Sequence, residues 1–187
     1  RDEHFGGMFL PVDLVTRQAD YHAHREDFRS MTDKFQADAS ILPGSVDSWY
    51  DAFLARERAV GELPVPATSA SFVEAVRTFV SSEAGQRHAA NVKFDWKNST
   101  ILATRVPALF VGLPSIKQEL AATDSTRAVT DSYPVFSGTA YSYPMLFWEG
   151  LAVVETEILR NVSLAAVCVF VMCWAVLNSL RAAVIVL

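Results

Sequence analysis

Histidines are the first residues of this chain whose spacing bears on metal binding or catalysis. The sequence contains four of them, His4, His22, His24 and His88. His22 and His24 are two residues apart, and side chains at that spacing on a helix point in different directions, so they make a poor metal pair. The HExxH motif, which places two histidines on one helix face, does not occur. The histidine pattern therefore predicts no metal centre.

Carboxylates are the second residue type that could carry chemistry here. Asp124, Asp131, Glu155 and Glu157 are candidates for paired general acids and bases. Charges on helix faces are usually just solvated, and no GxSxG, P-loop or GxGxxG motif accompanies these residues. We therefore predict that the chain is not an enzyme and has no catalytic residue and no cofactor.

Two other patterns concern modification and redox state. Asn98-Ser99-Thr100 is an N-glycosylation sequon on a predicted turn, which suits an extracytosolic domain. A second match, at residues 161–163, is predicted to lie at the bilayer, too close for modification. Cys168 and Cys173 both fall in an apolar run at a spacing that is neither CxxC nor a metal pattern, so we interpret them as small apolar helix residues.

The distribution of charge divides the chain into two parts. All 21 acidic residues and 15 of the 16 basic residues lie in residues 1–160. From Val162 to Leu187 the only polar residues are Ser163, Asn178, Ser179 and Arg181. This pattern predicts an acidic, water-facing domain followed by a membrane segment, and an acidic domain without a basic stripe argues against nucleic acid as a partner. The missing initial Met and the apolar end lead us to expect a piece of a longer protein.

The first half of the chain alternates strand and helix patterns. Residues 6–16 are typical of a strand interrupted by Pro11, and Asp20 is a plausible N-cap for the helix that follows. That helix has an apolar face of His24, Phe28, Met31 and Phe35. After a turn at 42–45, Trp49 and Phe53 share a face of a short helix. A Pro-rich loop at 61–71, which ends in Ser/Thr caps, leads to a helix with the apolar stripe Phe72, Val73, Val76, Phe79 and Val80.

The second half predicts a strand pair, a helix and a final strand. Val92–Asp95 and Thr100–Val111 have the pattern of strands joined by a turn at Asn98, and Pro107 predicts that the second is an edge or bulged strand. Pro114 starts a helix that runs to about Thr130, with Ile116 and Leu120 on its inner face. Residues 133–141 are expected to form the last strand. The order indicates an α+β sandwich with helices on one face of a largely antiparallel sheet.

Residues 144–187 follow a membrane pattern. An interfacial amphipathic helix over 144–160, with the stripe Phe147, Leu151, Val154 and Ile158, is predicted to continue into a transmembrane helix over 158–177. A cytosolic turn at 178–181 and the start of a next transmembrane helix at 182–187 are expected after it. Arg181 in that turn favours the cytosolic side, which places residues 1–143 outside the cell or in a lumen.

Aromatic residues gather just before the membrane helix. Tyr141, Tyr143, Phe147 and Trp148 have the side chains that prefer the headgroup layer of a bilayer. Pro144 fixes the corner between strand and helix, and Glu149 can cap the helix start or bond a neighbouring loop. Two interpretations remain open: the aromatic residues anchor the helix at the interface, or they form a lip through which lipids enter.

Three consecutive segments together resemble a known family: the stretch YSYPMLFWEGLAVVETEIL, the apolar helix after it, and NSLRAAVIVL. They are similar to the end of the second large extracytosolic domain, and its eighth membrane helix, in the Patched, Niemann–Pick type C and Dispatched group. Tyr143, Pro144, Phe147, Trp148 and Glu149 match that group's motif, whereas Gly150 and Leu151 replace the usual Gln-Tyr. VTRQADY at residues 15–21 is similar to a Patched segment that ends the first strand of this domain.

The resemblance implies a resistance-nodulation-division fold with ferredoxin-like βαβ extracytosolic domains. It implies an integral protein of the plasma or endosomal membrane that binds or transports sterol-like lipids, a glycoprotein driven by an ion gradient in its full-length form. The expected partners are a membrane lipid or sterol, the remaining domains of the same parent chain, and a protein ligand. The alternative is a receptor or release component that grips a protein partner, and a third hypothesis is an anchored ectodomain without transport.

Overall fold

The structure is a computed structural model. It describes residues 9–17, 19–61, 66, 68–95, 97 and 100–177, without the side chains of residues 60, 152, 155, 176 and 177. The chain divides into two compact units, Arg1–Met145 and Leu146–Leu187. The predicted glycosylation site at Asn98, the predicted cytosolic turn at 178–181 and the predicted next helix at 182–187 lie outside the described residues.

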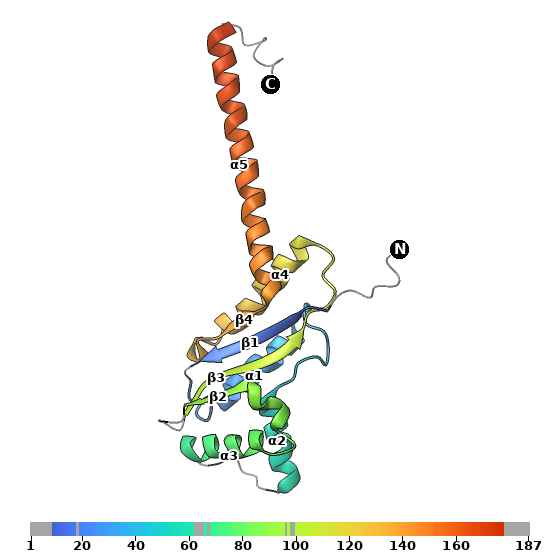
Figure 1. The fold of residues 1–187 in the computed structure, drawn as a ribbon, viewed down its shortest axis with the longest axis vertical. Helices are drawn as coiled ribbons and strands as arrows, with labels where there is room; N and C mark the ends of the chain where they lie inside the picture. Colours follow the sequence, from blue (N-terminus) through green and yellow to red (C-terminus); the bar gives the residue numbers. More distant parts are fainter. Residues whose placement is uncertain are drawn as a thin grey trace, which may run out of the picture. The chain divides into compact units, whose positions relative to one another are not determined.

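The first unit is built around one antiparallel sheet (Figure 1). Its strands are β1 (Pro11–Arg17), β2 (Val92–Asp95), β3 (Thr100–Leu109) and β4 (Thr139–Tyr141), in the spatial order β2-β3-β1-β4. The helices are α1 (Arg25–Ala37), α2 (Trp49–Val60), α3 (Ser69–Ser81) and α4 (Ile116–Asp131), with the short 3₁₀ helices η1 (Gln86–Asn91) and η2 (Pro134–Phe136). This arrangement confirms the predicted α+β class.

Alternation along the strands gives the sheet one buried face. In β1, Val12, Leu14 and Thr16 are buried, whereas the residues between them are not. In β3 the buried positions are Ile101, Thr104, Val106 and Ala108. A register shift between Lys93 and Phe94 in β2 explains the irregular step from Ile101 to Thr104. The opposite face of the sheet carries residues such as Asp13 and Tyr141, and none of the described strand residues on that face is buried.

Pro107 predicts an edge or a bulged strand, and the edge alternative is wrong, because β3 lies between β2 and β1. β3 does have an irregular register, since Leu102 is an extra residue between the pairs Lys93–Ala103 and Phe94–Ile101, but this irregularity lies away from Pro107. β2 pairs only with the Thr100–Thr104 part of β3. Beyond it, the Asp47 N–H donates to the Pro107 carbonyl at 2.9 Å. The N–H and C=O of one strand residue point to the same side, so the N–H that proline lacks would face this loop and not β1. The central strand therefore accepts a proline at no cost to its pairing with β1.

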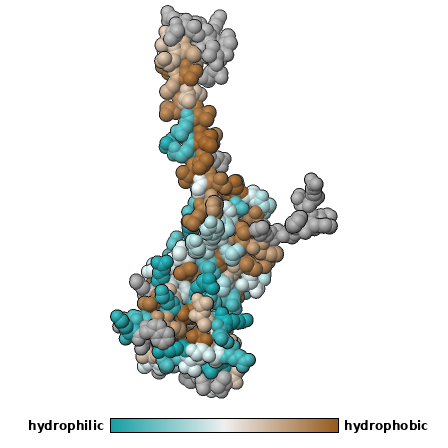
Figure 2. All heavy atoms as spheres, in the orientation of Figure 1, coloured by the Kyte–Doolittle hydropathy of each residue, from teal (hydrophilic) through white to brown (hydrophobic). Residues whose placement is uncertain are grey.

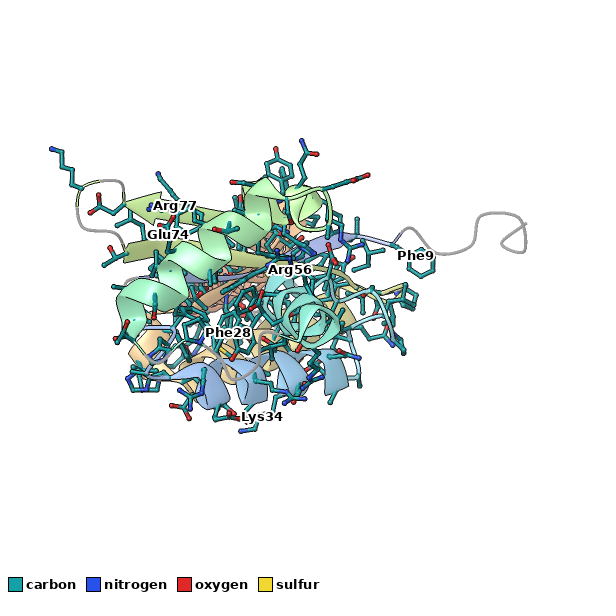
Figure 3. All side chains as sticks on the ribbon, turned by 90° about the horizontal axis from the view of Figure 1, so that it is seen from below. Phe9, Phe28, Lys34, Arg56, Glu74 and Arg77 are labelled. Carbon is teal, nitrogen blue, oxygen red and sulfur yellow. The ribbon has the colours of Figure 1, made fainter. Side chains whose placement is uncertain are left out.

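The first three helices bury the large apolar residues that their periodicity predicts. α1 begins at Arg25, however, so the predicted cap Asp20 and the predicted face residue His24 both lie before it, and the His24 side chain is 41% exposed. Phe28, Met31 and Phe35 of α1 are buried, and so are all five residues of the predicted stripe of α3. Figure 3 shows Phe28 pointing into the interior and Lys34, also on α1, pointing outward. Ser48 caps α2. Thr68 and Ser71 form a capping box at the start of α3, as predicted from the Ser/Thr caps at the end of the Pro-rich loop.

Aromatic rings connect these helices into one core. Neighbouring rings lie 5.5 to 6.4 Å apart between centroids, mostly in tilted or edge-to-face geometry. The rings belong to Tyr21, Phe28, Trp49, Tyr50, Phe53, Phe72, Phe79 and Phe136. This cluster fixes the segment after β1 against α2 and α3, and that segment carries part of the candidate site.

Two predictions in the second half need correction. Ile116 does not lie on the inner face of α4: it is 44% exposed, and Leu120 is only partly buried. The buried residues are Ala122, Thr123, Thr126 and Thr130. These threonines bury their methyl groups because their hydroxyls bond carbonyls of the preceding turn, such as Thr126 Oγ1 to Ala122 O at 2.7 Å. The predicted last strand, 133–141, is shorter, because η2 occupies its first half and β4 begins at Thr139.

Candidate functional site

The residues of the predicted interfacial motif lie at the start of α5 (Tyr143–Leu177). Ser142 precedes the helix, and its hydroxyl donates to the Pro11 carbonyl at 2.6 Å, which ties the helix start to β1. Pro144 occupies the first turn, where its missing N–H is not needed. Met145 is buried. The corner between β4 and α5 is therefore fixed by contacts within the first unit.

The motif residues differ in exposure. Tyr143 is 66% exposed and Phe147 is 56% exposed. Tyr141, in β4, is 44% exposed. Trp148 is only 5% exposed, which sets it apart from the other three aromatic residues. Pro144 and Glu149 are half-buried.

The described part of the second unit is the rest of α5, and the surface of this helix is apolar for most of its length. Figure 2 shows the hydrophobic surface along this helix with one hydrophilic patch part-way. Within α5, Arg160 and Glu157 form an ion pair, with 2.7 Å between Nη2 and Oε2. Within the described residues, one helix, Tyr143–Ala175, is long enough and apolar enough to cross a membrane. The most apolar stretch of this helix is not buried.

A pocket of about 570 Å³ lies in the first unit, where β1 ends and β3 begins. Buried side chains form its floor: Tyr21, Phe72, Val73 and Ile101. Polar side chains also line it: Asp20, His22, Ser69, Asp95 and Thr100. The volume is in the range of small-molecule sites, ~300–1,000 Å³, and so is the combination of an apolar floor with a few polar groups.

Asp20 is held in place on the rim of this pocket by three hydrogen bonds. Its Oδ1 accepts from the backbone N–H groups of His22 and Ala23, at 3.0 and 3.1 Å. Its Oδ2 accepts from the Ser69 hydroxyl at 2.7 Å. Partial burial raises the pKa of Asp20, but these hydrogen bonds and the nearby His22 outweigh it, so the pKa lies below its usual value. The carboxylate is thus ionised at neutral pH.

His22 faces the same pocket in a fixed orientation. Its Nε2 lies 2.7 Å from the Pro66 carbonyl, which can only accept, so Nε2 carries a proton. The centroid of the His22 ring also lies 5.7 Å from the centroid of the Phe72 ring. His22 and His24 lie in the turn before α1 and not on a helix, and His24 instead contacts Asp27 at 3.2 Å. The structure does not bring the two histidines together in one site.

The predicted carboxylate candidates are also not assembled. Asp124 and Asp131 are exposed on α4. Glu157 pairs with Arg160, and the side chain of Glu155 lies outside the described residues. Among the described residues, no group of three or more His, Cys, Asp or Glu side chains is placed to hold a metal ion.

Sequence reasoning missed the pocket itself. It assigned Asp20 to a helix cap and the loop before α3 to Ser/Thr caps, but no sequence signal joins Asp20 to Ser69, which lies 49 residues further along the chain. No protein-family model matches the chain, and no curated protein is significantly similar to it.

Proposed function

We propose that the chain is part of a multi-span membrane protein of the Patched, Niemann–Pick type C and Dispatched group. In this proposal its extracytosolic domain binds or conducts sterol-like lipids, and the full-length protein couples this to an ion gradient. The observation that carries the proposal is the direct passage from an α+β domain into a 35-residue helix with an exposed apolar surface. Soluble proteins rarely leave so much contiguous apolar surface exposed.

The topology of the first unit supports this proposal. Apart from α2 and α3, the elements follow the order strand, helix, two strands, helix, strand. β3 lies between β1 and β2 and antiparallel to both, and β4 pairs with the other edge of β1. This is the order expected of a ferredoxin-like, split βαβ domain, the type that the resemblance implies.

The membrane placement follows from the length of α5. A hydrocarbon core of ~30 Å needs ~20 apolar residues. Residues 158–177 span it in this proposal, with Arg160 extending toward the interface and residues 144–157 in the headgroup region. The proposal puts residues 1–143 outside the cell or in a lumen, because Arg181 after the span favours the cytosolic side.

A second candidate function is binding of a protein partner. It is favoured by the uncovered face of the sheet, where none of the described strand residues is buried. This face includes Tyr141 at 44% exposure and the Arg105–Asp13 ion pair, with 3.6 Å between nitrogen and oxygen. A receptor or release component would use such a face.

The experiment that tests the leading proposal is binding of a radiolabelled sterol to the full chain in lipid nanodiscs. We expect saturable binding that unlabelled sterol competes away, above the linear partitioning measured with empty nanodiscs. Linear uptake identical to that of empty nanodiscs would refute lipid binding by this chain and leave the protein-partner function.

A matched pair of variants separates the two interpretations of the aromatic residues. Phe147→Ala removes a ring that is 56% exposed, and Leu159→Ala is the control on the same helix, where the side chain is 64% exposed. If the aromatic residues form a lip for lipid, Phe147→Ala alone slows sterol uptake several-fold. If they only anchor the helix, both variants bind at the wild-type rate.

A further inference from the structure

Acidic groups outnumber basic ones among the residues that line the pocket at the end of β1. Two of them are carboxylates, Asp20 and Asp95, one is a histidine, His22, and none is a lysine or arginine. Arg25 is close by, but its guanidinium donates to the His22 backbone carbonyl at 3.3 Å and does not line the pocket. A ligand with a positive charge is therefore favoured over an anion.

Asp20 has an acceptor site left for such a ligand. An ionised carboxylate has about four lone-pair positions, and the three hydrogen bonds from His22, Ala23 and Ser69 occupy three of them. These bonds also fix the carboxylate, so little conformational entropy is lost when a donor binds. Asp20 is thus a preorganised carboxylate at the mouth of an apolar pocket, where it can pair with a cationic group.

The floor of the pocket is apolar, which determines the chemistry expected for the uncharged part of the ligand. Phe72, Val73 and Ile101 are 1%, 7% and 4% exposed and belong to α3 and β3, which the core holds rigidly. Leu102, 38% exposed, adds apolar surface at the rim. An apolar ring or short chain would bury surface here, at ~25 cal/mol per Å².

We propose that this pocket binds an amphipathic organic cation, whose ammonium group pairs with Asp20 while its apolar body packs on Phe72, Val73 and Ile101. The site lies entirely in the first unit and uses no residue of α5. It therefore goes beyond the proposed sterol function and does not depend on it.

Three probes with the same phenyl body test the charge preference: 2-phenylethylammonium, 2-phenylethanol and 3-phenylpropanoate. Each is titrated against the full chain in nanodiscs of zwitterionic lipid, with empty nanodiscs as the blank, by saturation-transfer NMR. We expect saturable binding of the ammonium compound, about fivefold tighter than that of the alcohol, which is the upper end for a charge pair at an exposed site. The carboxylate compound should bind most weakly.

Two variants locate the site. Asp20→Asn keeps an oxygen for the N–H groups of His22 and Ala23 and should weaken ammonium binding about fivefold while leaving alcohol binding unchanged. Ala70→Leu, at an exposed helix position on the pocket wall, should weaken all three probes. The matched controls are Asp124→Asn and Ala121→Leu on the exposed side of α4, and they should bind all probes as the wild type does.

Equal affinity for the three probes would overturn the proposal, because an apolar pocket without charge selection would explain it. So would unchanged ammonium binding in folded Asp20→Asn, or the lack of saturable binding of any probe. Sterol binding is measured separately, so its failure would not affect this result, and the reverse also holds.

Discussion

His88 is a fully buried histidine whose contacts make its charge state important for the fold. Its ring stacks on Phe79, with 6.1 Å between centroids. The Arg87 Nε–H group donates to its Nε2 at 3.0 Å, so Nε2 carries no proton and the ring is neutral in this arrangement. Asp47 Oδ2 lies 3.7 Å from Nδ1. Burial lowers the pKa of His88 below 6.5, Asp47 partly opposes this, and Arg87 adds to it.

We predict that the stability of the first unit falls at mildly acidic pH because of His88. Since its pKa in the folded chain is below 6.5, the unfolded chain takes up the proton first. The contribution of neutral His88 is therefore fully present above about pH 6.5 and is lost as the pH falls through the lowered pKa. Protonation of Nε2 would also place its proton against the Arg87 guanidinium.

An NMR titration of the His88 ring in the full chain measures this directly. We expect a midpoint below 6.5, together with a urea midpoint that decreases between pH 7 and pH 5. The His88→Gln variant, if folded, should lose most of that pH dependence. A His88 midpoint above 6.5 would show that Asp47, and not burial, controls the ring.

At the scale of elements, the connection between α3 and η1 depends on Gly85. A Cβ atom at this position would lie 2.1 Å from the Phe79 carbonyl oxygen, which is backbone and cannot move away as a side chain can. The Gly85 N–H also donates to the Ser82 carbonyl at 3.1 Å, which keeps the turn tight. We predict that Gly85→Ala destabilises the first unit by about 1–3 kcal/mol.

The measurement is urea unfolding of the full chain, followed by near-UV circular dichroism of the aromatic core. Gly150→Ala is the matched control, because a Cβ atom there would meet no heavy atom within 4 Å apart from its chain neighbours and the backbone of its own helix. It should be neutral or slightly stabilising, since alanine favours a helix. A wild-type midpoint for Gly85→Ala would mean that the α3–η1 turn shifts at no cost.

Elements were predictable from the sequence where apolar residues follow a clear period. The stripes of α1 and α3 identified their buried faces because large side chains alternate with polar ones at helical spacing. The inner face of α4 was not predictable in this way, because threonines occupy it and the exposed Ile116 suggests the wrong side. The pocket was unpredictable, because the contact of Asp20 with Ser69 depends on how the segment after β1 packs against α3.

At the scale of the whole chain, the proposed membrane function depends on the length and polarity of α5. Its 35 residues rise ~1.5 Å each, so the helix is longer than a hydrocarbon core of ~30 Å. The Glu157–Arg160 pair separates the first part of the helix, which carries charged residues, from an apolar part that begins near Val162. This division was evident from the sequence, because the cost of placing charge in lipid acts on composition alone and needs no knowledge of packing.

The most direct test of the account is whether α5 holds the chain in a membrane. The full chain is expressed in microsomes and extracted with alkaline carbonate, next to a variant with Val167→Arg and Val171→Arg. Each arginine at the centre of a span costs about 2.5–3.5 kcal/mol, so this variant should be released. A control with Ile116→Arg and Val135→Arg, exposed apolar positions of the first unit, should stay with the membrane.

We predict that the wild-type chain and this control remain in the membrane pellet, whereas the α5 variant appears in the supernatant. Release of the wild-type chain by carbonate would contradict the account, because α5 would then be a peripheral or protein-bound helix and the lipid function would lose its structural basis.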